Sequence, residues 1–244
     1  MTAFYNEIDP YAAQWLRNLI DAGHIAPGVV DERSIEDIEP AELAQYTQCH
    51  FFAGIGVWSL ALRKAGWPDD RPVWTGSCPC QPFSAAGKGA GFADERHLWP
   101  AFHHLISQCR PPAVFGEQVA SRDGLEWLDL VQADLEGSGF AVGAADLCAA
   151  GVGAPHIRQR IYWAAHPERD EQPREEPCGG TAGRVGRQLQ PMAWDGGWEA
   201  ALARFRAVGD GASRCVEGTD AARNAIVPQV AQIFIECYMK DQSC

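Results

Sequence analysis

The sequence has no apolar run that approaches the roughly 18 residues needed for a membrane-spanning helix. Its N-terminus also lacks the basic segment followed by an apolar segment that marks an export signal. The nine cysteines are odd in number and scattered along the chain, unlike the disulfide framework of a small secreted protein. These absences favour a protein of the cytosol whose thiols are free.

An excess of positive charge is missing as well, because 20 basic residues stand against 32 acidic ones, a net charge of −12. A protein that simply coats nucleic acid needs basic side chains for the phosphates, so this class is disfavoured. The charges are unevenly distributed. Residues 1–157 hold 20 acidic and 9 basic residues, whereas residues 158–223 hold 10 of each, every basic one an arginine. Any DNA-binding surface is expected in the second stretch.

Metal binding has little support in the sequence. Cys78 and Cys80 form a C-x-C pair, which is half of a zinc site, but no second pair of Cys or His follows at the spacing of a zinc finger. Isolated pairs of this kind are unreliable signals. We therefore expect no metal ion.

A length of 244 residues with 46% hydrophobic content suits one full domain and a small additional lobe. Short apolar runs alternate with amphipathic segments. The predicted strands cover residues 3–5, 25–30, 49–52, 73–75, 113–115, 140–145 and 160–165. The predicted helices cover residues 10–22, 57–65, 98–108, 124–135 and 228–239. This alternation predicts an α/β fold with a parallel sheet and ligands at the carboxyl ends of its strands.

Two stretches lack this periodicity. Residues 31–43 read as an acidic connector, and from residue 166 the chain turns to Pro, Gly, Arg and Glu. We predict one main domain of residues 1–165 that is completed by residues 222–244. Residues 166–221 are predicted to form a small irregular lobe or a partly ordered insert.

Three polar motifs lie beside predicted strands. Cys80 lies on a proline-stiffened loop directly after a strand, where α/β enzymes present catalytic groups. The tripeptide Glu117-Gln118-Val119 ends another strand, and Arg158-Gln159-Arg160 precedes a third. A loop cysteine alone is more often structural. The presence of the other two motifs in the same chain is what favours a catalytic role for Cys80.

Together these motifs resemble those of the DNA cytosine-5 methyltransferase family. The matches are the nucleophile motif Pro79-Cys80-Gln81-Pro82-Phe83-Ser84, the Glu-Asn-Val motif at Glu117-Gln118-Val119, the Arg-x-Arg motif at Arg158-Gln159-Arg160, the cofactor loop Phe52-Ala53-Gly54-Ile55-Gly56 and the last motif at Asn224-Ala-Ile-Val-Pro-Gln-Val230. They cover most of the chain outside residues 166–222. The resemblance implies the Rossmann-like sheet of S-adenosylmethionine-dependent methyltransferases, double-stranded DNA as partner, and a monomer in the cytoplasm of a bacterial or phage-infected cell. It also implies that residues 1–165 and 222–244 form the catalytic domain that binds S-adenosylmethionine, and that residues 166–221 form the lobe that recognises the target.

The resemblance also implies a mechanism. Cys80 is expected to add to C6 of a cytosine rotated out of the duplex, because C5 is a poor nucleophile until aromaticity is broken. Glu117 is expected to be the general acid at N3, with a pKa raised by its pocket. Arg158 and Arg160 are expected to hold the base or its phosphate and to lower the thiol pKa, although a plain surface pair is the simpler interpretation. The expected substrate contacts are Pro79, Gln81 and Ser84.

For the cofactor, the resemblance implies a glycine turn whose backbone approaches the methionine moiety, with Phe52 near the adenine. Two positions depart from the family pattern, because His50 stands where Asp is usual and Arg223 where Gly is usual. The expected cofactor contacts in this part of the chain are Phe52, Ala53, Gly54, Ile55, Gly56, Leu98 and Asn224.

The order of the motifs is unusual. Only 28 positions separate Phe52 from Cys80, which leaves room for one helix, whereas the family places two further strand–helix units there. We infer a permuted chain in which those units come first. Glu7 and Ile8 then carry the ribose motif, and residues 28–35 carry the adenine motif.

Alternatives remain open at both of these positions. Asp69 or Asp70 stands near the distance from the glycine turn that dinucleotide folds use for the ribose ligand, but neither follows a strand. Strict alignment puts Val29 at the adenine position, and Asp31, two positions later, is the preferred ligand.

The function itself also has alternatives. The first is C5-methylation of cytosine in duplex DNA. The second is modification of RNA, or transfer of a different one-carbon group, by the same thiolate addition. The third is a non-catalytic DNA-binding homologue. The intact Cys80, Glu117 and arginine pair favour an enzyme.

Overall fold

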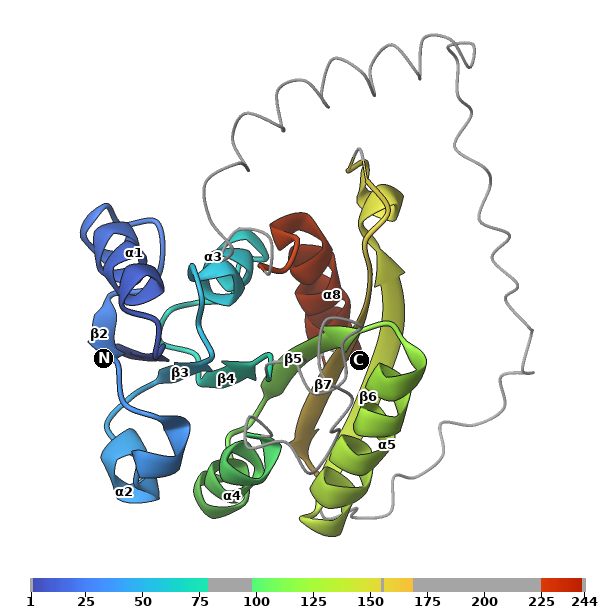
Figure 1. Cartoon of the computed structure of the whole chain (residues 1–244), viewed down its shortest axis with the longest axis horizontal. Coiled ribbons are helices and arrows are strands. Elements are labelled where there is room, and N and C mark those ends of the chain that lie inside the picture. Colours follow the sequence, from blue (N-terminus) through green and yellow to red (C-terminus); the bar gives the residue numbers. More distant parts are fainter. Residues whose placement is uncertain (1, 79–97, 155, 169–224, 243–244) are drawn as a thin grey trace, which may run out of the picture. The chain divides into compact units, whose positions relative to one another are not determined.

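The computed structural model describes residues 2–78, 98–154, 156–168 and 225–242 (Figure 1). They form a seven-stranded sheet of order β2-β1-β3-β4-β5-β7-β6 with helices on both faces. The strands are β1 (Ala3–Asn6), β2 (Gly28–Asp31), β3 (Gln48–Phe51), β4 (Val73–Gly76), β5 (Val114–Val119), β6 (Phe140–Cys148) and β7 (Gln159–Pro167). The helices are α1 (Pro10–Asp21), α2 (Pro40–Leu43), α3 (Val57–Lys64), α4 (Trp99–Cys109), α5 (Arg122–Gly137) and α8 (Pro228–Asp241), with 3₁₀ turns η1 (Ile35–Asp37) and η4 (Ala149–Val152). The predicted α/β class is confirmed.

The direction of the strands divides the sheet into two parts. Strands β2, β1, β3, β4 and β5 are parallel, whereas β7 is antiparallel to β5 and β6 is antiparallel to β7. The prediction of a parallel sheet is therefore correct for five strands and wrong for the last two. The physical reason is the short connection between β6 and β7, because a parallel pair needs a crossover of a dozen or more residues.

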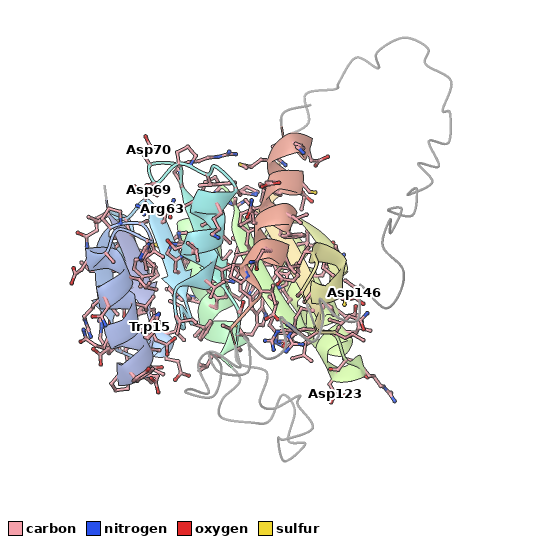
Figure 2. All side chains as sticks on the ribbon, turned by 90° about the horizontal axis from the view of Figure 1, so that it is seen from above. Trp15, Arg63, Asp69, Asp70, Asp123 and Asp146 are labelled. Carbon is pink, nitrogen blue, oxygen red and sulfur yellow. The ribbon has the colours of Figure 1, made fainter. Side chains whose placement is uncertain are left out.

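The parallel strands end at one edge of the sheet, and the candidate residues follow from those ends. Glu7 follows β1, Asp31 ends β2 and Phe52 follows β3. Figure 2 shows Asp123, at the start of the helix after β5, at this end of the molecule, while Asp69 and Asp70 lie at the opposite end. The fold thus gathers the sequence motifs of the parallel strands at one edge.

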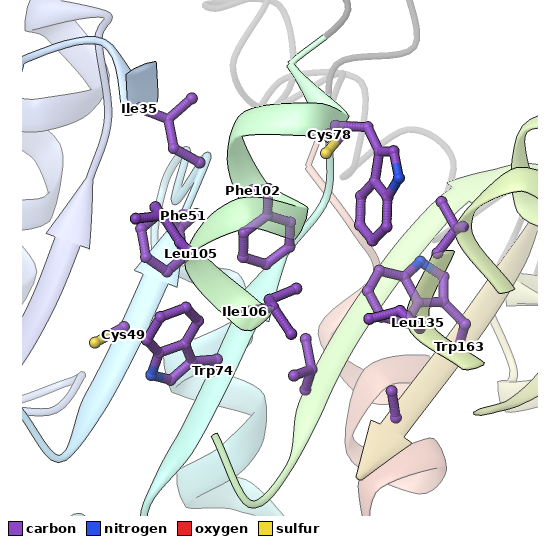
Figure 3. Close-up of a cluster of buried hydrophobic side chains, with 14 of the residues drawn as sticks. Ile35, Cys49, Phe51, Trp74, Cys78, Phe102, Leu105, Ile106, Leu135 and Trp163 are labelled. Carbon is purple, nitrogen blue, oxygen red and sulfur yellow. The ribbon is translucent and has the colours of Figure 1, made fainter. Parts of the chain in front are cut away.

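Helices cover both faces of the sheet. In Figure 1, α1, α3 and α8 lie on one side and α2, α4 and α5 on the other. A cluster of buried hydrophobic side chains lies beneath α4, where Phe102 contacts Phe51 (Figure 3). Trp99 contacts Trp163 in the same cluster. The prediction that the final helix packs back on the sheet is confirmed, because α8 packs against α3 and β7.

The element boundaries differ from the prediction in several places, and three of them bear on the site. Strand β5 continues to Val119 rather than ending at residue 115, so Glu117 lies inside the strand. Strand β2 begins at Gly28, three residues later than predicted. The connector over residues 31–43 contains η1 and α2, which begin with a Ser34 side-chain cap and with Pro40. Within the described ranges, none of the helices has both the length and the apolar character needed to cross a membrane.

Candidate active site

Glu117 and Arg160 form the centre of the candidate active site. Glu117 lies on β5 and Arg160 on the antiparallel strand β7, where Tyr162 is the register partner of Glu117. Residues two apart on a strand share a face, so Arg160 stands diagonally across from Glu117. Its Nε lies 2.7 Å from Oε1 of Glu117, and the two side chains are 21% and 10% exposed. The ladder between β5 and β7 therefore creates a largely buried ion pair.

Arg158 adds a second positive charge to this centre. Its Nη2 donates a hydrogen bond of 2.9 Å to the backbone oxygen of Ala225, in the segment before α8. Its charge acts on both Glu117 and Tyr162. The structure thus brings Arg160 into contact with Glu117 and places Arg158 near enough for its charge to act on Glu117. It also shows Tyr162 beside them, a residue that the motifs did not single out.

The carboxyl group of Glu117 has a pKa of about 7. Burial, which disfavours the ionised form, is the largest cause, and the charges of Arg160 and Arg158 lower the pKa to a smaller extent. The contact with Arg160 is an ion pair without the alignment of a hydrogen bond, because Oε1 accepts no well-directed hydrogen bond from the described residues. A carboxyl group that titrates near neutral pH can donate a proton and take it back.

The neighbours of Glu117 on β5 fix its backbone. A Cβ atom on Gly116 would lie 2.3 Å from Cε2 of the buried Trp163, so only glycine lets the indole lie against the strand. Gln118 is buried, and its Oε1 accepts a hydrogen bond of 2.9 Å from the backbone nitrogen of Val119. Both contacts hold the strand where it presents Glu117.

Glu7 lies beside the glycine turn after β3. Its Oε2 accepts a hydrogen bond of 2.6 Å from the backbone nitrogen of Gly54, and its Oε1 accepts one of 3.0 Å from Asp9. Asp9 in turn caps α1 through Ala12. Each carboxylate oxygen of Glu7 keeps acceptor capacity beyond these bonds. Two segments that are distant in the sequence, 7–9 and 52–56, therefore form one edge of the sheet.

The glycine turn has a left-handed backbone at three positions. Phe52, Gly54 and Gly56 have φ angles of 51°, 52° and 76°. Such a φ is uncommon for a residue other than glycine, so Phe52 marks a strained position of the kind found at ligand sites. The ring of Phe52 packs edge to face against that of Phe102, with ring centroids 6.0 Å apart. Leu98, at the start of α4, packs half-buried against the same hydrophobic cluster as Phe52.

Asp31 has a partner that sequence reasoning missed. Nη2 of Arg33 lies 2.7 Å from Oδ2 of Asp31 and 2.5 Å from Oε2 of Glu42. The hydrogen bond from Arg33 is the largest cause that lowers the pKa of Asp31, which is therefore ionised at neutral pH. An arginine two residues after an aspartate is too common a pattern to predict this contact.

His50, at the position where the family has Asp, has turned into the interior. Its ring stacks on Tyr5 with centroids 4.8 Å apart, and Nδ1 lies 2.8 Å from Oγ1 of Thr75. Burial lowers its pKa to about 3, so the ring is neutral. This side chain cannot provide the negative charge of the family's aspartate.

The alternative ribose ligands lie at the wrong edge of the sheet. Asp69 pairs with Arg63 at 2.6 Å, and Nη1 of Arg63 also donates to the backbone oxygen of Gly23. Figure 2 shows Arg63, Asp69 and Asp70 together, away from the end that carries Asp123. Neither aspartate lies beside the glycine turn, whereas Glu7 does.

Several predicted residues lie outside the described ranges. These are Pro79, Cys80, Gln81, Ser84 and Asn224. Cys78, two residues before Cys80, is described and is buried in the cluster of Figure 3. Among the described residues, no group of three or more His, Cys, Asp or Glu side chains could hold a metal ion.

Comparisons with known proteins point to one family. A family model described as C-5 cytosine-specific DNA methylase matches residues 61–178. The type II methyltransferase M.NlaX of Neisseria lactamica is 32% identical over 125 residues, which are 50% of this chain and 40% of that protein. M.HhaI of Haemophilus parahaemolyticus is 33% identical over 97 residues, which are 38% of this chain and 30% of that protein. The chain thus spans less than half the length of these relatives.

Matches among solved structures include a triple mutant of Spodoptera frugiperda DNMT2. It has a TM-score of 0.46 and 19% identity, and the match covers 69% of this chain and 45% of that chain. The Entamoeba histolytica methyltransferase EhMeth has a TM-score of 0.41 and 14% identity, covering 71% of this chain and 55% of that chain.

Proposed function

We propose, from the premise that this chain belongs to the C-5 cytosine-specific DNA methylase family, that it transfers a methyl group from S-adenosylmethionine to C5 of cytosine in duplex DNA. The observation that carries the proposal is the buried Glu117 carboxyl, with a pKa of about 7, beside Arg160 and Arg158. A carboxyl that is protonated near neutral pH is what the N3 atom of a cytosine needs opposite it.

The proposed reaction begins with a covalent bond from Cys80. Its thiolate adds to C6 of a cytosine rotated out of the helix, which breaks the aromaticity of the ring. Glu117 gives its proton to N3, so the electron pair displaced from the ring is stabilised there. C5 then takes the methyl group, and the neutral thioether S-adenosylhomocysteine is the leaving group. Water takes the proton from C5 as the thiolate leaves C6, and N3 returns its proton to Glu117. The ring regains its aromaticity with the methyl group in place.

The two arginines serve the proposed site in different ways. Arg160 neutralises Glu117 whenever it is ionised, because its Nε is 2.7 Å away. Arg158 is held by the backbone of Ala225 and carries a planar guanidinium suited to a phosphate or a carbonyl. Pro79, Gln81 and Ser84 are proposed as further contacts to the flipped nucleotide.

The edge of the sheet fits the cofactor. S-Adenosylmethionine, when bound, supplies the electrophilic methyl group. Glu7 has acceptor capacity for ribose hydroxyls, and Asp31, its neighbour across β1 and β2, is an ionised acceptor for an amino group. Phe52 and Leu98 offer apolar surface from one cluster. Ile8, Ala53, Ile55, Gly54, Gly56 and Asn224 complete the proposed set.

We also propose that the chain is permuted relative to its family. Counted from β3, the strand order β2-β1-β3-β4-β5 is the 3-2-1-4-5 order of a doubly wound sheet, with β1 and β2 as its second and third strands. The family model begins its match at residue 61, after these three strands. Both observations support an origin in which the family's second and third strand units moved to the front of the chain.

The domain division follows from the same proposal. Residues 1–165 and 222–244 are proposed as the catalytic domain of a monomer, and residues 166–221 as the lobe that reads the DNA sequence. The ten arginines of residues 158–223 favour a phosphate-facing surface there.

A methyl-transfer assay tests the proposed function. The full chain, incubated with labelled S-adenosylmethionine, is expected to label duplex DNA and leave total RNA unlabelled. Cys80→Ser is expected to abolish labelling, and DNA containing 5-fluorocytosine is expected to trap the wild type as a covalent adduct. Labelling of RNA alone would instead support an RNA-modifying enzyme. If neither DNA nor RNA is labelled and no covalent adduct forms, the result would support a non-catalytic homologue.

A further inference from the structure

The turn after β2 is held by contacts from three elements. Asp31 ends the strand, Arg33 lies two residues later and Glu42 lies on α2. Asn6, at the end of β1, is the register partner of Asp31. We propose that Arg33 is a positioning residue that holds the Asp31 carboxylate in place as the acceptor for the exocyclic amino group of the cofactor's adenine. The inference rests on the proposed function, because it deepens the role of the cofactor edge.

Arg33 donates hydrogen bonds to both carboxylate oxygens of Asp31. Its backbone nitrogen donates to Oδ1 at 2.9 Å, its Nη2 donates to Oδ2 at 2.7 Å, and its Nε lies 3.0 and 3.2 Å from the two oxygens. A carboxylate offers about four acceptor positions, so these three donors leave about one. The remaining position suits a single N–H donor from a ligand.

Glu42 holds the far side of the guanidinium. Its Oε2 lies 2.5 Å from Nη2 and its Oε1 lies 3.4 Å from Nη1 of Arg33. The backbone oxygen of Asp37 also accepts from Nη1 at 3.4 Å. An arginine bound on two sides in this way loses its rotamer freedom before any ligand binds, so the orientation of Asp31 is set in advance.

Asn6 fixes the backbone of the same turn from the neighbouring strand. Its buried Nδ2 donates to the backbone oxygen of Arg33 at 2.8 Å and to that of Asp31 at 3.4 Å. The backbone nitrogen of Glu7 donates to the oxygen of Asp31 at 3.0 Å. The turn that carries Asp31 is therefore tied to Glu7, the proposed ribose ligand.

The chemistry predicts which ligand group this arrangement selects. An ionised carboxylate accepts hydrogen bonds and donates none. It therefore favours the amino group of adenine over the carbonyl group of hypoxanthine, whose oxygen would face negative charge. Discrimination between these two bases is a property that a merely structural Arg33 would not control.

Calorimetric binding of two ligands to the full chain tests this proposal. The probes are S-adenosylhomocysteine and S-inosylhomocysteine, in which an oxygen replaces the adenine amino group. The wild type is expected to prefer the adenosyl compound by at least about tenfold. Arg33→Met is expected to weaken binding of the adenosyl compound by about tenfold and to change the inosyl compound little, so the preference collapses. Arg33→Lys, which keeps the charge without the fork, is expected to lie between the two.

The matched control is Arg17→Met. Arg17 on α1 pairs with Glu32 at 2.6 Å, next to Asp31 in the sequence, and both side chains are 39% exposed. Its loss is expected to change neither affinity by more than about twofold. Should Arg33→Met fail to fold, Glu42→Gln is the substitute, with a smaller loss of preference.

Two results have distinct meanings. An adenosyl-over-inosyl preference that stays at the wild-type value in folded Arg33→Met and Glu42→Gln would overturn the role of Arg33. Absence of S-adenosylhomocysteine binding by the wild type would instead overturn the proposed function on which that role rests.

Discussion

At the scale of single residues, the protein places one carboxyl group between two opposing influences. Burial favours the protonated form of Glu117, while the guanidinium groups of Arg160 and Arg158 favour the ionised form. Burial is the larger influence, and the resulting pKa of about 7 leaves both forms populated at neutral pH. A surface glutamate with the same neighbours would be fully ionised and unable to act as an acid.

The pH dependence of the proposed methyl transfer should reveal this balance. If Glu117 must be protonated to act at N3, kcat/KM is expected to fall as the pH rises through about 7, because the acid form disappears. Glu117→Gln is expected to reduce kcat on the order of 10²- to 10⁴-fold and to remove this alkaline limb. Methyl transfer measured from pH 5.5 to 9 with wild type and variant provides the check. An unchanged alkaline limb in the variant would assign that limb to another group.

At the scale of elements, the strand pair β5–β7 builds the site, and Gly116 is the position that permits this pair. Gly116→Ala would place a methyl group 2.3 Å from the buried indole of Trp163, so a loss of about 1–3 kcal/mol in unfolding free energy is expected. Urea denaturation measures the loss. Gly143→Ala on β6 is the matched control, because a Cβ there meets nothing within 4 Å.

The same prediction allows a rescue. Trp163→Phe removes the indole atoms that the new methyl group would meet, so the double variant is expected to recover part of the loss at Gly116. Equal unfolding free energies of Gly116→Ala and Gly143→Ala would contradict the prediction, because they would show that Trp163 can move away from β5 with no loss of stability.

The elements also show how far sequence reasoning reaches. Short apolar runs predicted every strand of the sheet, because this signal is local. They failed at Gly116-Glu117-Gln118, where the polar tripeptide predicted a strand end, because the partner strand β7 extends β5 through its own hydrogen bonds. The family motifs singled out Glu117 and Arg160 separately, but the ion pair between them was not predicted, because it depends on the antiparallel register of β5 and β7. The Arg33 contact had no such signal, since it depends on a glutamate nine residues further along.

At the scale of the whole molecule, the proposed permutation makes a direct prediction. A chain with residues 47–66 first, then 1–46, then 67–244, joined by short Gly-Ser linkers, is expected to fold to the same sheet. The new joints lie near existing contacts, because the nitrogen of Thr47 donates to the oxygen of Thr2 and Nε2 of Gln48 donates to the oxygen of Pro68.

The rearranged chain is expected to unfold within about 5 °C of the original and to bind S-adenosylhomocysteine with an affinity within about threefold. Thermal unfolding followed by circular dichroism, together with calorimetry, measures both. The matched control carries the same linkers inserted without rearrangement. A collapse of the rearranged chain alone would mean that the present order of strands is needed for folding.

The hydrogen bond from Gly54 to Glu7 joins positions 47 apart in the chain. Binding of a small molecule at this contact would depend on where the two residues lie in space and not on their order in the sequence. Under the proposed permutation, the order in which the chain encodes these two segments can therefore change while the contact between them in the fold stays the same.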